Sequence, residues 1–150
     1  MIELNPPFAV ERGILAVLLS WSLSQLVKIM TGMRREKRFD FKWIFNTGGM
    51  PSSHSAAVAS LATVVGLYYS FKSMPFLMAF IYCMIIMFDA AGVRRSVGRQ
   101  AEILNKIMED LNKGREVPDA RVKELLGHTP IEVFAGATVG ILISLVICLP

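Results

Sequence analysis

The sequence is poor in the residues that build metal sites and disulfides, since its 150 residues include two cysteines and two histidines. Cys83 and Cys148 lie within apolar segments, and neither has a second cysteine or a histidine at ligand spacing nearby. The sequence therefore supports neither a zinc site nor a disulfide framework, and no metal or other cofactor is expected. Charged residues are also scarce, at 19%, and no internal repeat or low-complexity tract is present.

Apolar residues make up 53% of the chain, more than an ordinary water-soluble domain carries. They gather into four runs, each close to the ~20 residues that cross a ~30 Å hydrocarbon layer as a helix. The runs cover residues 8–27, 51–71, 75–91 and 129–149. We therefore predict an all-α integral membrane protein, one domain over residues 1–150 with four transmembrane helices. No cleaved signal peptide is expected, because Glu3 precedes the first run and no small-residue cleavage pattern follows it.

Positive charge is distributed unevenly between the segments that link these runs. Of 16 lysines and arginines, six lie in residues 28–42 and eight in residues 94–123, whereas the remaining link has Lys72 alone. Because cytoplasmic loops are enriched in lysine and arginine, both basic links are predicted to be cytoplasmic, in a multi-pass protein of the cell membrane with both termini outside. The cytoplasmic ends of all four runs then meet at one face. The residues placed there are Lys28, His54, Arg94 and His128.

The two histidines each stand at the start of an apolar run. One ends the stretch Gly-Gly-Met-Pro-Ser-Ser-His over residues 48–54, and the other begins the stretch His-Thr-Pro-Ile-Glu over residues 128–132. Cleavage of a phosphate ester without a metal needs a nucleophile, an acid for the leaving group and fixed positive charge. Two imidazoles among basic side chains can supply all three, so the sequence predicts a phosphate-ester site at the cytoplasmic face.

The start of the second run has the residues of an anion-binding helix start. Pro51 suits the first turn of a helix, and Ser52 and Ser53 place hydroxyls beside the backbone N–H groups that a helix N-terminus leaves unpaired. His54 would then face a bound phosphate. The alternative is a serine-rich helix start with a histidine at the membrane interface.

Glu132 has two explanations. With Thr129 it fits the capping box Thr-x-x-Glu, and Pro130 fits the first helical position. Alternatively, its carboxylate accepts a hydrogen bond from one ring nitrogen of His128, so that the other nitrogen can attack phosphorus. One carboxylate is not expected to fulfil both roles completely, and the sequence leaves the choice open.

The link between the third and fourth runs contains two helical patterns. Apolar residues recur at helical spacing between Gly98 and Asn112, and a second short helix is expected over residues 118–126. Both are predicted to be amphipathic helices at the membrane surface or against neighbouring helices, where they could form a lid or a homodimer contact. Asp89, in the third run, is expected to pair with Arg94 and position it rather than touch a substrate.

Two of these stretches resemble motifs of the phosphatidic acid phosphatase type 2 and vanadium haloperoxidase superfamily. Residues 51–54 are similar to its Pro-Ser-Gly-His motif, and residues 128–132 to its final His-x-x-x-Asp motif. The closer match is the divergent, haloperoxidase-related branch of small membrane proteins, which carries Gly-Gly-Met-Pro-Ser-Ser-His-Ser and Asp-Ala-x-Gly-Val-Arg…Gly-Arg-Gln-Ala. The matching residues here are 48–55, 89–94 and 98–101.

The resemblance implies a role for each matched residue. His128 would be the nucleophile, His54 the general acid for the leaving alcohol, and Glu132 the carboxylate that orients His128. Lys28 and Arg35 match the superfamily's first motif, a lysine followed after six residues by Arg-Pro, although Glu36 replaces the proline. Together with Ser52 and the backbone at Ser53, they would hold the phosphate.

Two positions depart from the superfamily pattern. Ser53 stands where the Pro-Ser-Gly-His motif has glycine. Val122 stands six residues before His128, where the superfamily has an arginine. Arg94 is the candidate to replace that arginine, with Arg99 and Arg121 as further candidates. Because superfamily members typically have six membrane helices, a four-helix version could need a partner subunit to complete the site.

These observations predict a metal-independent lipid phosphatase that acts through a phosphohistidine intermediate. Its substrate would be a phospholipid or isoprenoid phosphate, with phosphatidylglycerophosphate or phosphatidic acid favoured over a pyrophosphate displayed outside, and no nucleic-acid partner is expected. One alternative is a non-catalytic protein that binds or translocates phospholipid headgroups through the same basic pocket. Another is an assembly protein whose short helices dock a partner.

Overall fold

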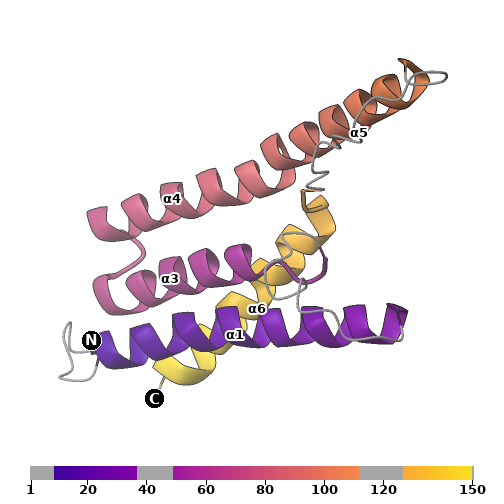
Figure 1. Ribbon diagram of the computed structural model, residues 1–150. Coiled ribbons are helices and arrows are strands. Elements are labelled where there is room, and N and C mark those ends of the chain that lie inside the picture. Colours follow the sequence, from indigo (N-terminus) through magenta and orange to yellow (C-terminus); the bar gives the residue numbers. More distant parts are fainter. Residues whose placement is uncertain (1–8, 37–48, 112–126, 150) are drawn as a thin grey trace.

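The computed structural model describes residues 9–36, 49–111 and 127–149, and within them the chain forms five helices and no strand. The helices are α1 (Ala9–Glu36), α3 (Ser53–Tyr69), α4 (Met74–Ala91), α5 (Val93–Leu111) and α6 (Pro130–Cys148) (Figure 1). The predicted all-α fold is therefore confirmed for this part of the chain.

Helix α3 lies at the centre of the bundle. It packs against α1, α4 and α6, and α1 and α6 also pack against each other. A short turn between α3 and α4 makes these two helices antiparallel, while α6 crosses them obliquely (Figure 1). Helix α5 continues beyond the bundle from the end of α4, which is the one described helix that it contacts.

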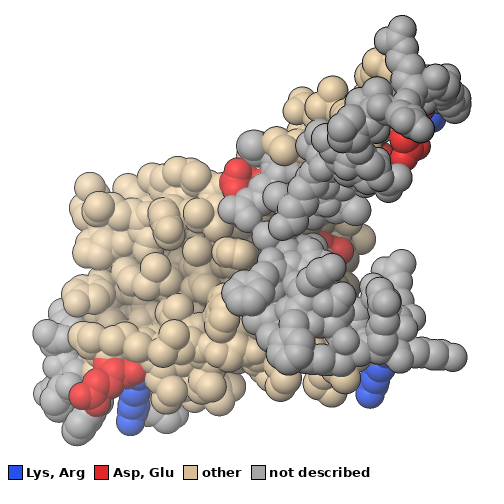
Figure 2. Space-filling model, in the orientation of Figure 1, with Lys and Arg blue, Asp and Glu red and all other residues tan. Residues whose placement is uncertain are grey.

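Three helical segments are long and apolar enough to cross a membrane. They are Ala9–Arg34, Met74–Glu109 and Pro130–Cys148. Side chains on the outer side of the bundle are largely apolar. In the left half of Figure 2, a continuous surface without described charged residues separates the charged residues at the lower left from those near the centre. The membrane protein predicted from the sequence is supported. The count of four spans stays a prediction, because α3 has 17 residues.

Helices α3 and α6 approach each other through small residues. Gly136 of α6 lies against the Ser52 carbonyl oxygen, and Gly140 lies one turn later against the carbonyl oxygen of Ala56. A Cβ atom at either glycine would overlap these backbone atoms. Small residues four apart are typical of membrane helices whose backbones pack closely, and this contact sets how α3 and α6 lie together.

A hydrogen bond between two serines completes the same contact. The hydroxyl oxygens of Ser60 in α3 and Ser144 in α6 are 2.8 Å apart, and both side chains are fully buried. The Ser144 hydroxyl also lies 2.9 Å from the Gly140 carbonyl oxygen. Such bonds satisfy polar groups where neither lipid nor water can do so, and each contributes on the order of 1 kcal/mol.

Two helix boundaries differ from the sequence prediction. Helix α1 continues past the expected end at residue 27 to Glu36, so Lys28 is a helical residue on its buried face. Helix α5 begins at Val93 rather than near Gly98. Gly92 does not interrupt the hydrogen bonding, since its N–H donates to the Phe88 carbonyl oxygen and its own carbonyl accepts from a later N–H. The short helix expected over residues 118–126 falls outside the described residues.

We expect Gly140→Ala to weaken the bundle, because the added methyl group would meet the α3 backbone, which cannot move aside as a side chain can. Overpacking of this kind lowers the free energy of unfolding by roughly 1–3 kcal/mol. The measurement is unfolding of the purified protein in detergent, followed by its helical circular dichroism signal.

The matched control for this variant is Val146→Ala on the same helix. The Val146 side chain is 82% exposed in the protein and faces away from α3, so its truncation should change stability by less than about 0.5 kcal/mol. Equal stability of Gly140→Ala and the parent would contradict the close crossing of α3 and α6.

Candidate functional site

Backbone hydrogen bonds join the starts of α3 and α6 and the end of α4. The Ser52 N–H donates to the Glu132 carbonyl oxygen at 3.0 Å, and the His128 N–H donates to the Ala90 carbonyl oxygen at 3.1 Å. Because His54 follows Ser52 by two residues, both histidines lie at the same end of the bundle. Residues far apart in the sequence are brought together there by main-chain contacts.

The side chains of His128 and Glu132 are in contact. His128 Nδ1 and Glu132 Oε2 are 3.0 Å apart, and the same oxygen accepts the Thr129 N–H at 3.1 Å. The Thr129 hydroxyl in turn accepts the Glu132 N–H at 3.4 Å, which completes the capping box. Both contacts that the sequence left open are therefore present. One carboxylate oxygen can make both contacts because it has two lone pairs.

This contact determines the tautomer of the neutral His128 ring. An ionised carboxylate can only accept, so the proton is on Nδ1 and the lone pair is on Nε2. The His128 side chain is 3% exposed, and its Nε2 atom is buried. A neutral imidazole held this way has the orientation and the electron pair that a nucleophile or a base requires.

The start of α3 is organised by its serines. Ser52 is the N-cap residue, and its hydroxyl oxygen lies 3.4 Å from the Ser55 N–H and 3.0 Å from the Ser55 hydroxyl. Ser52 and Ser53 are both buried, whereas the side chain of His54 is exposed. The helix start thus places partial positive charge and hydroxyl groups at the end of the bundle that also holds His128.

Lys28 of α1 is the buried cation of this region. It is 7% exposed, and its ammonium group interacts electrostatically with the Glu132 carboxylate. Its aliphatic stem lies against Gly49, where an added Cβ would be 3.3 Å from Lys28 Cγ. The φ angle of +103° at Gly49 also favours glycine. A buried charge needs compensation by other charges or polar groups, and here Glu132 contributes it.

The remaining predicted site residues lie on α1, α4 and α5, and they are Arg35, Asp89, Arg94 and Arg99. Arg99 is exposed on α5, which does not contact α1, α3 or α6, so the structure does not bring it to the histidines. Asp89 is partly buried and precedes Ala90, whose carbonyl receives the His128 N–H. The backbones of Arg35 and Arg94 belong to α1 and α5, but their side chains fall outside the described set. The predicted pairing of Asp89 with Arg94 stays a prediction.

The sequence did not predict how three residues position the site. Gly49 makes room for the stem of Lys28, Ala90 anchors the start of α6, and Gly136 allows α6 to approach Ser52. The four-residue spacing from Gly136 to Gly140 in an apolar segment could have predicted the last of these. Within the described ranges, no three His, Cys, Asp or Glu side chains gather to form a metal site.

Comparison with known proteins supports the motif resemblance. Residues 10–143 match the divergent PAP2 family, which covers most of the chain, including Lys28, both histidines and Glu132. The chain belongs to the divergent PAP2 family. It is also 41% identical to the uncharacterized membrane protein YuiD of Bacillus subtilis (strain 168), over 97% of each chain. No solved structure matches it.

Membership of the divergent PAP2 family is consistent with the arrangement of the site. The helix ends that carry the two histidine motifs are the ones that hydrogen-bond to each other. A relationship to phosphatases follows from the family, whereas catalysis by this chain does not follow from it alone.

We expect Lys28 and Glu132 to depend on each other for stability. Glu132→Gln removes the charge that faces the buried ammonium, so it should cost less stability in a Lys28→Met background than in the parent. A double-mutant cycle of unfolding in detergent should give a coupling of about 0.5–3 kcal/mol.

The control cycle pairs Glu132→Gln with Lys72→Met, because Lys72 is exposed in the turn between α3 and α4. The changes that Glu132→Gln and Lys72→Met cause in the free energy of unfolding should add within about 0.5 kcal/mol. If the effects in the Lys28 and Glu132 cycle add as closely as those in the Lys72 and Glu132 cycle, Lys28 and Glu132 do not interact.

Proposed function

We propose that this member of the divergent PAP2 family is an integral membrane lipid phosphatase that needs no metal. The observation that carries the proposal is the contact between His128 and Glu132 at a helix end shared with the buried Lys28 and the start of α3. A ring with an oriented proton, next to fixed positive charge, is suited to phosphoryl transfer.

The proposed reaction has two steps. His128 Nε2 attacks the phosphorus of a lipid phosphomonoester, the bond from phosphorus to the lipid oxygen breaks, and His54 donates a proton to the leaving alkoxide. A phosphohistidine forms on His128. His54 then accepts a proton from a water molecule that attacks this phosphorus, which releases inorganic phosphate and restores the neutral His128 ring.

The phosphate would be held by charge and by main-chain groups. A phosphate dianion loses its hydration on binding, so the site must offset that cost with positive groups. Lys28 provides one charge, and the N-terminal dipole of α3, which begins at Ser53, provides partial positive charge. We assign Arg35 and Arg94 as further phosphate contacts on the basis of the motifs.

The membrane orientation belongs to the same proposal. We take α3 as the fourth span, because it is the central helix of a bundle whose other members are long enough to cross the bilayer. The site would face the cytoplasm and both termini would lie outside. Phosphatidylglycerophosphate or phosphatidic acid in the inner leaflet would then reach it directly.

One observation favours a second candidate, a protein that binds or translocates phospholipid headgroups without turnover. Ser53 is 2% exposed and adds a buried side chain where active superfamily members have glycine. The superfamily arginine is also replaced by Val122. This candidate keeps the basic pocket and removes the need for His128 as a nucleophile.

We expect His128→Asn to abolish phosphate release, and His54→Asn to slow it in a substrate-dependent way. Without His54 the rate for phosphatidic acid should fall by about 10²–10⁴, the usual contribution of a general acid. The rate for para-nitrophenyl phosphate should fall much less, because nitrophenolate leaves without protonation. The measurement is phosphate release by purified protein in detergent.

Thermal unfolding of both variants serves as the control for folding. Equal activity of His128→Asn and the parent would refute the nucleophile. A parent that binds phosphatidic acid and releases no phosphate from it, from phosphatidylglycerophosphate or from para-nitrophenyl phosphate would refute the phosphatase and support the headgroup-binding candidate.

The orientation predicts which links are accessible from outside. In a variant whose buried Cys83 and Cys148 are replaced by serine, Lys37→Cys and Lys113→Cys should react with a membrane-impermeant maleimide after permeabilisation of the cells and not before. Lys72→Cys is the control and should react in intact cells. Labelling of Lys37→Cys or Lys113→Cys from outside would contradict the orientation.

A further inference from the structure

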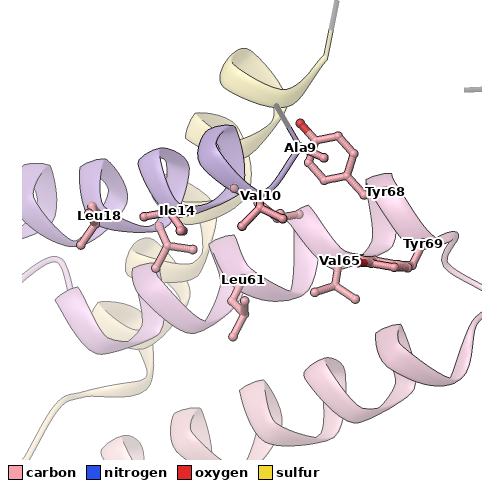
Figure 3. A pocket seen from close by; sticks show the side chains of 11 residues that line it. Ala9, Val10, Ile14, Leu18, Leu61, Val65, Tyr68 and Tyr69 are labelled. Atoms are coloured by element: carbon pink, nitrogen blue, oxygen red, sulfur yellow. The ribbon is translucent and has the colours of Figure 1, made fainter. Parts of the chain in front are cut away.

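An apolar groove runs along the bundle between α1 and α3. Its volume is about 360 Å³, within the range of sites that bind small ligands. Val10, Ile14 and Leu18 line it from α1, and Leu61 and Val65 line it from α3 (Figure 3). These helices belong to the membrane bundle, and three of these side chains, Val10, Ile14 and Leu18, are more than half exposed. The groove is therefore open to the hydrocarbon layer.

The α3 side of the groove leads to His54. Residues three or four positions apart share one face of a helix, and this spacing connects the groove residues Tyr69, Val65 and Leu61 through Val58 to His54. The exposed imidazole thus stands on the face of α3 that forms the groove wall. His54 is also the residue proposed to protonate the leaving alcohol of a lipid.

The α1 side of the groove leads in the same direction. Val10, Ile14 and Val17 line the groove, and the same face continues through Trp21 to the buried Lys28. The helix faces that form the two walls of the groove therefore also carry, further along each helix, residues assigned to the phosphate site. An apolar groove on the same helix faces as a cation and an imidazole matches the chemistry of a lipid phosphate, which joins an apolar chain to a charged group.

We propose that the groove between α1 and α3 holds the hydrocarbon chain of the lipid whose phosphate binds beside Lys28 and His128. This inference rests on the proposed function and extends it, because it assigns a second, apolar subsite to the substrate. The chain on the leaving alcohol would pass His54 and reach Leu61 and Val65 in the groove.

The length of the path makes the proposal specific. At the helical rise of ~1.5 Å per residue, Leu61 lies about 10 Å and Tyr69 about 22 Å from His54 along α3. A short chain would end before the groove begins. A chain that fills the groove would pass the middle of a ~30 Å hydrocarbon layer. The groove should therefore select long chains and be insensitive to short ones.

The test fills the groove and compares two monoester substrates, oleyl phosphate and hexyl phosphate. Ile14→Trp and Leu61→Trp replace side chains that are 56% and 38% exposed, so the folded bundle can accept them. Each should raise KM for oleyl phosphate by roughly tenfold, about the loss of two buried methylenes, and leave KM for hexyl phosphate unchanged. The matched control is Ile81→Trp on α4, outside the groove, which should change neither.

A binding measurement separates this inference from the catalytic proposal. Oleyl phosphate with a photoreactive diazirine near the end of its chain should crosslink to α1 and α3 groove residues, and inorganic phosphate should compete. If this occurs without phosphate release, the groove assignment holds and the phosphatase fails. The proposal would be overturned if crosslinks formed on α4 as often as on α1 and α3, or if Ile81→Trp and Leu61→Trp changed KM equally. Either result would show that the groove does not bind the hydrocarbon chain specifically.

Discussion

The close crossing of α3 and α6 is the constraint on which the rest of the molecule depends. Gly136 and Gly140 let the α6 backbone touch the carbonyl oxygens of Ser52 and Ala56, so the two helices cannot slide without a clash. One turn before Gly136, the Glu132 carbonyl is held by the Ser52 N–H. The contact that packs the bundle is therefore the contact that brings the two histidine motifs together.

Glu132 shows how stability and the proposed chemistry share one group. Its carboxylate completes the cap of α6, contacts the His128 ring and acts electrostatically on the buried Lys28. A buried lysine and a partly buried carboxylate are costly to desolvate and are weak evidence of stability by themselves. Their presence at a helix end with an oriented imidazole fits the proposed site for a charged ligand, because preorganised charges do not have to be rearranged when the ligand arrives.

The bundle also has the polarity of an amphipathic substrate. Its end holds hydroxyls, a cation and two imidazoles, whereas the seam of α1 and α3 is apolar and open to lipid. Small residues at the α3 and α6 contact allow these helices to pack closely, while larger side chains on the opposite side of α3 leave the groove beside α1. One central helix thus contributes to the core, to the proposed phosphate site and to the groove.

Composition and spacing determined much of this protein. The apolar runs predicted the helices, and Thr129, Pro130 and Glu132 predicted the start of α6, because these signals act within a few residues. The motifs around His54 and His128 indicated the family. Tertiary structure decided that the starts of α3 and α6 hydrogen-bond to each other, that Lys28 is buried, and that Arg99 lies apart from α1, α3 and α6. Those outcomes depend on distances between helices that are remote in sequence, and no local pattern encodes such distances.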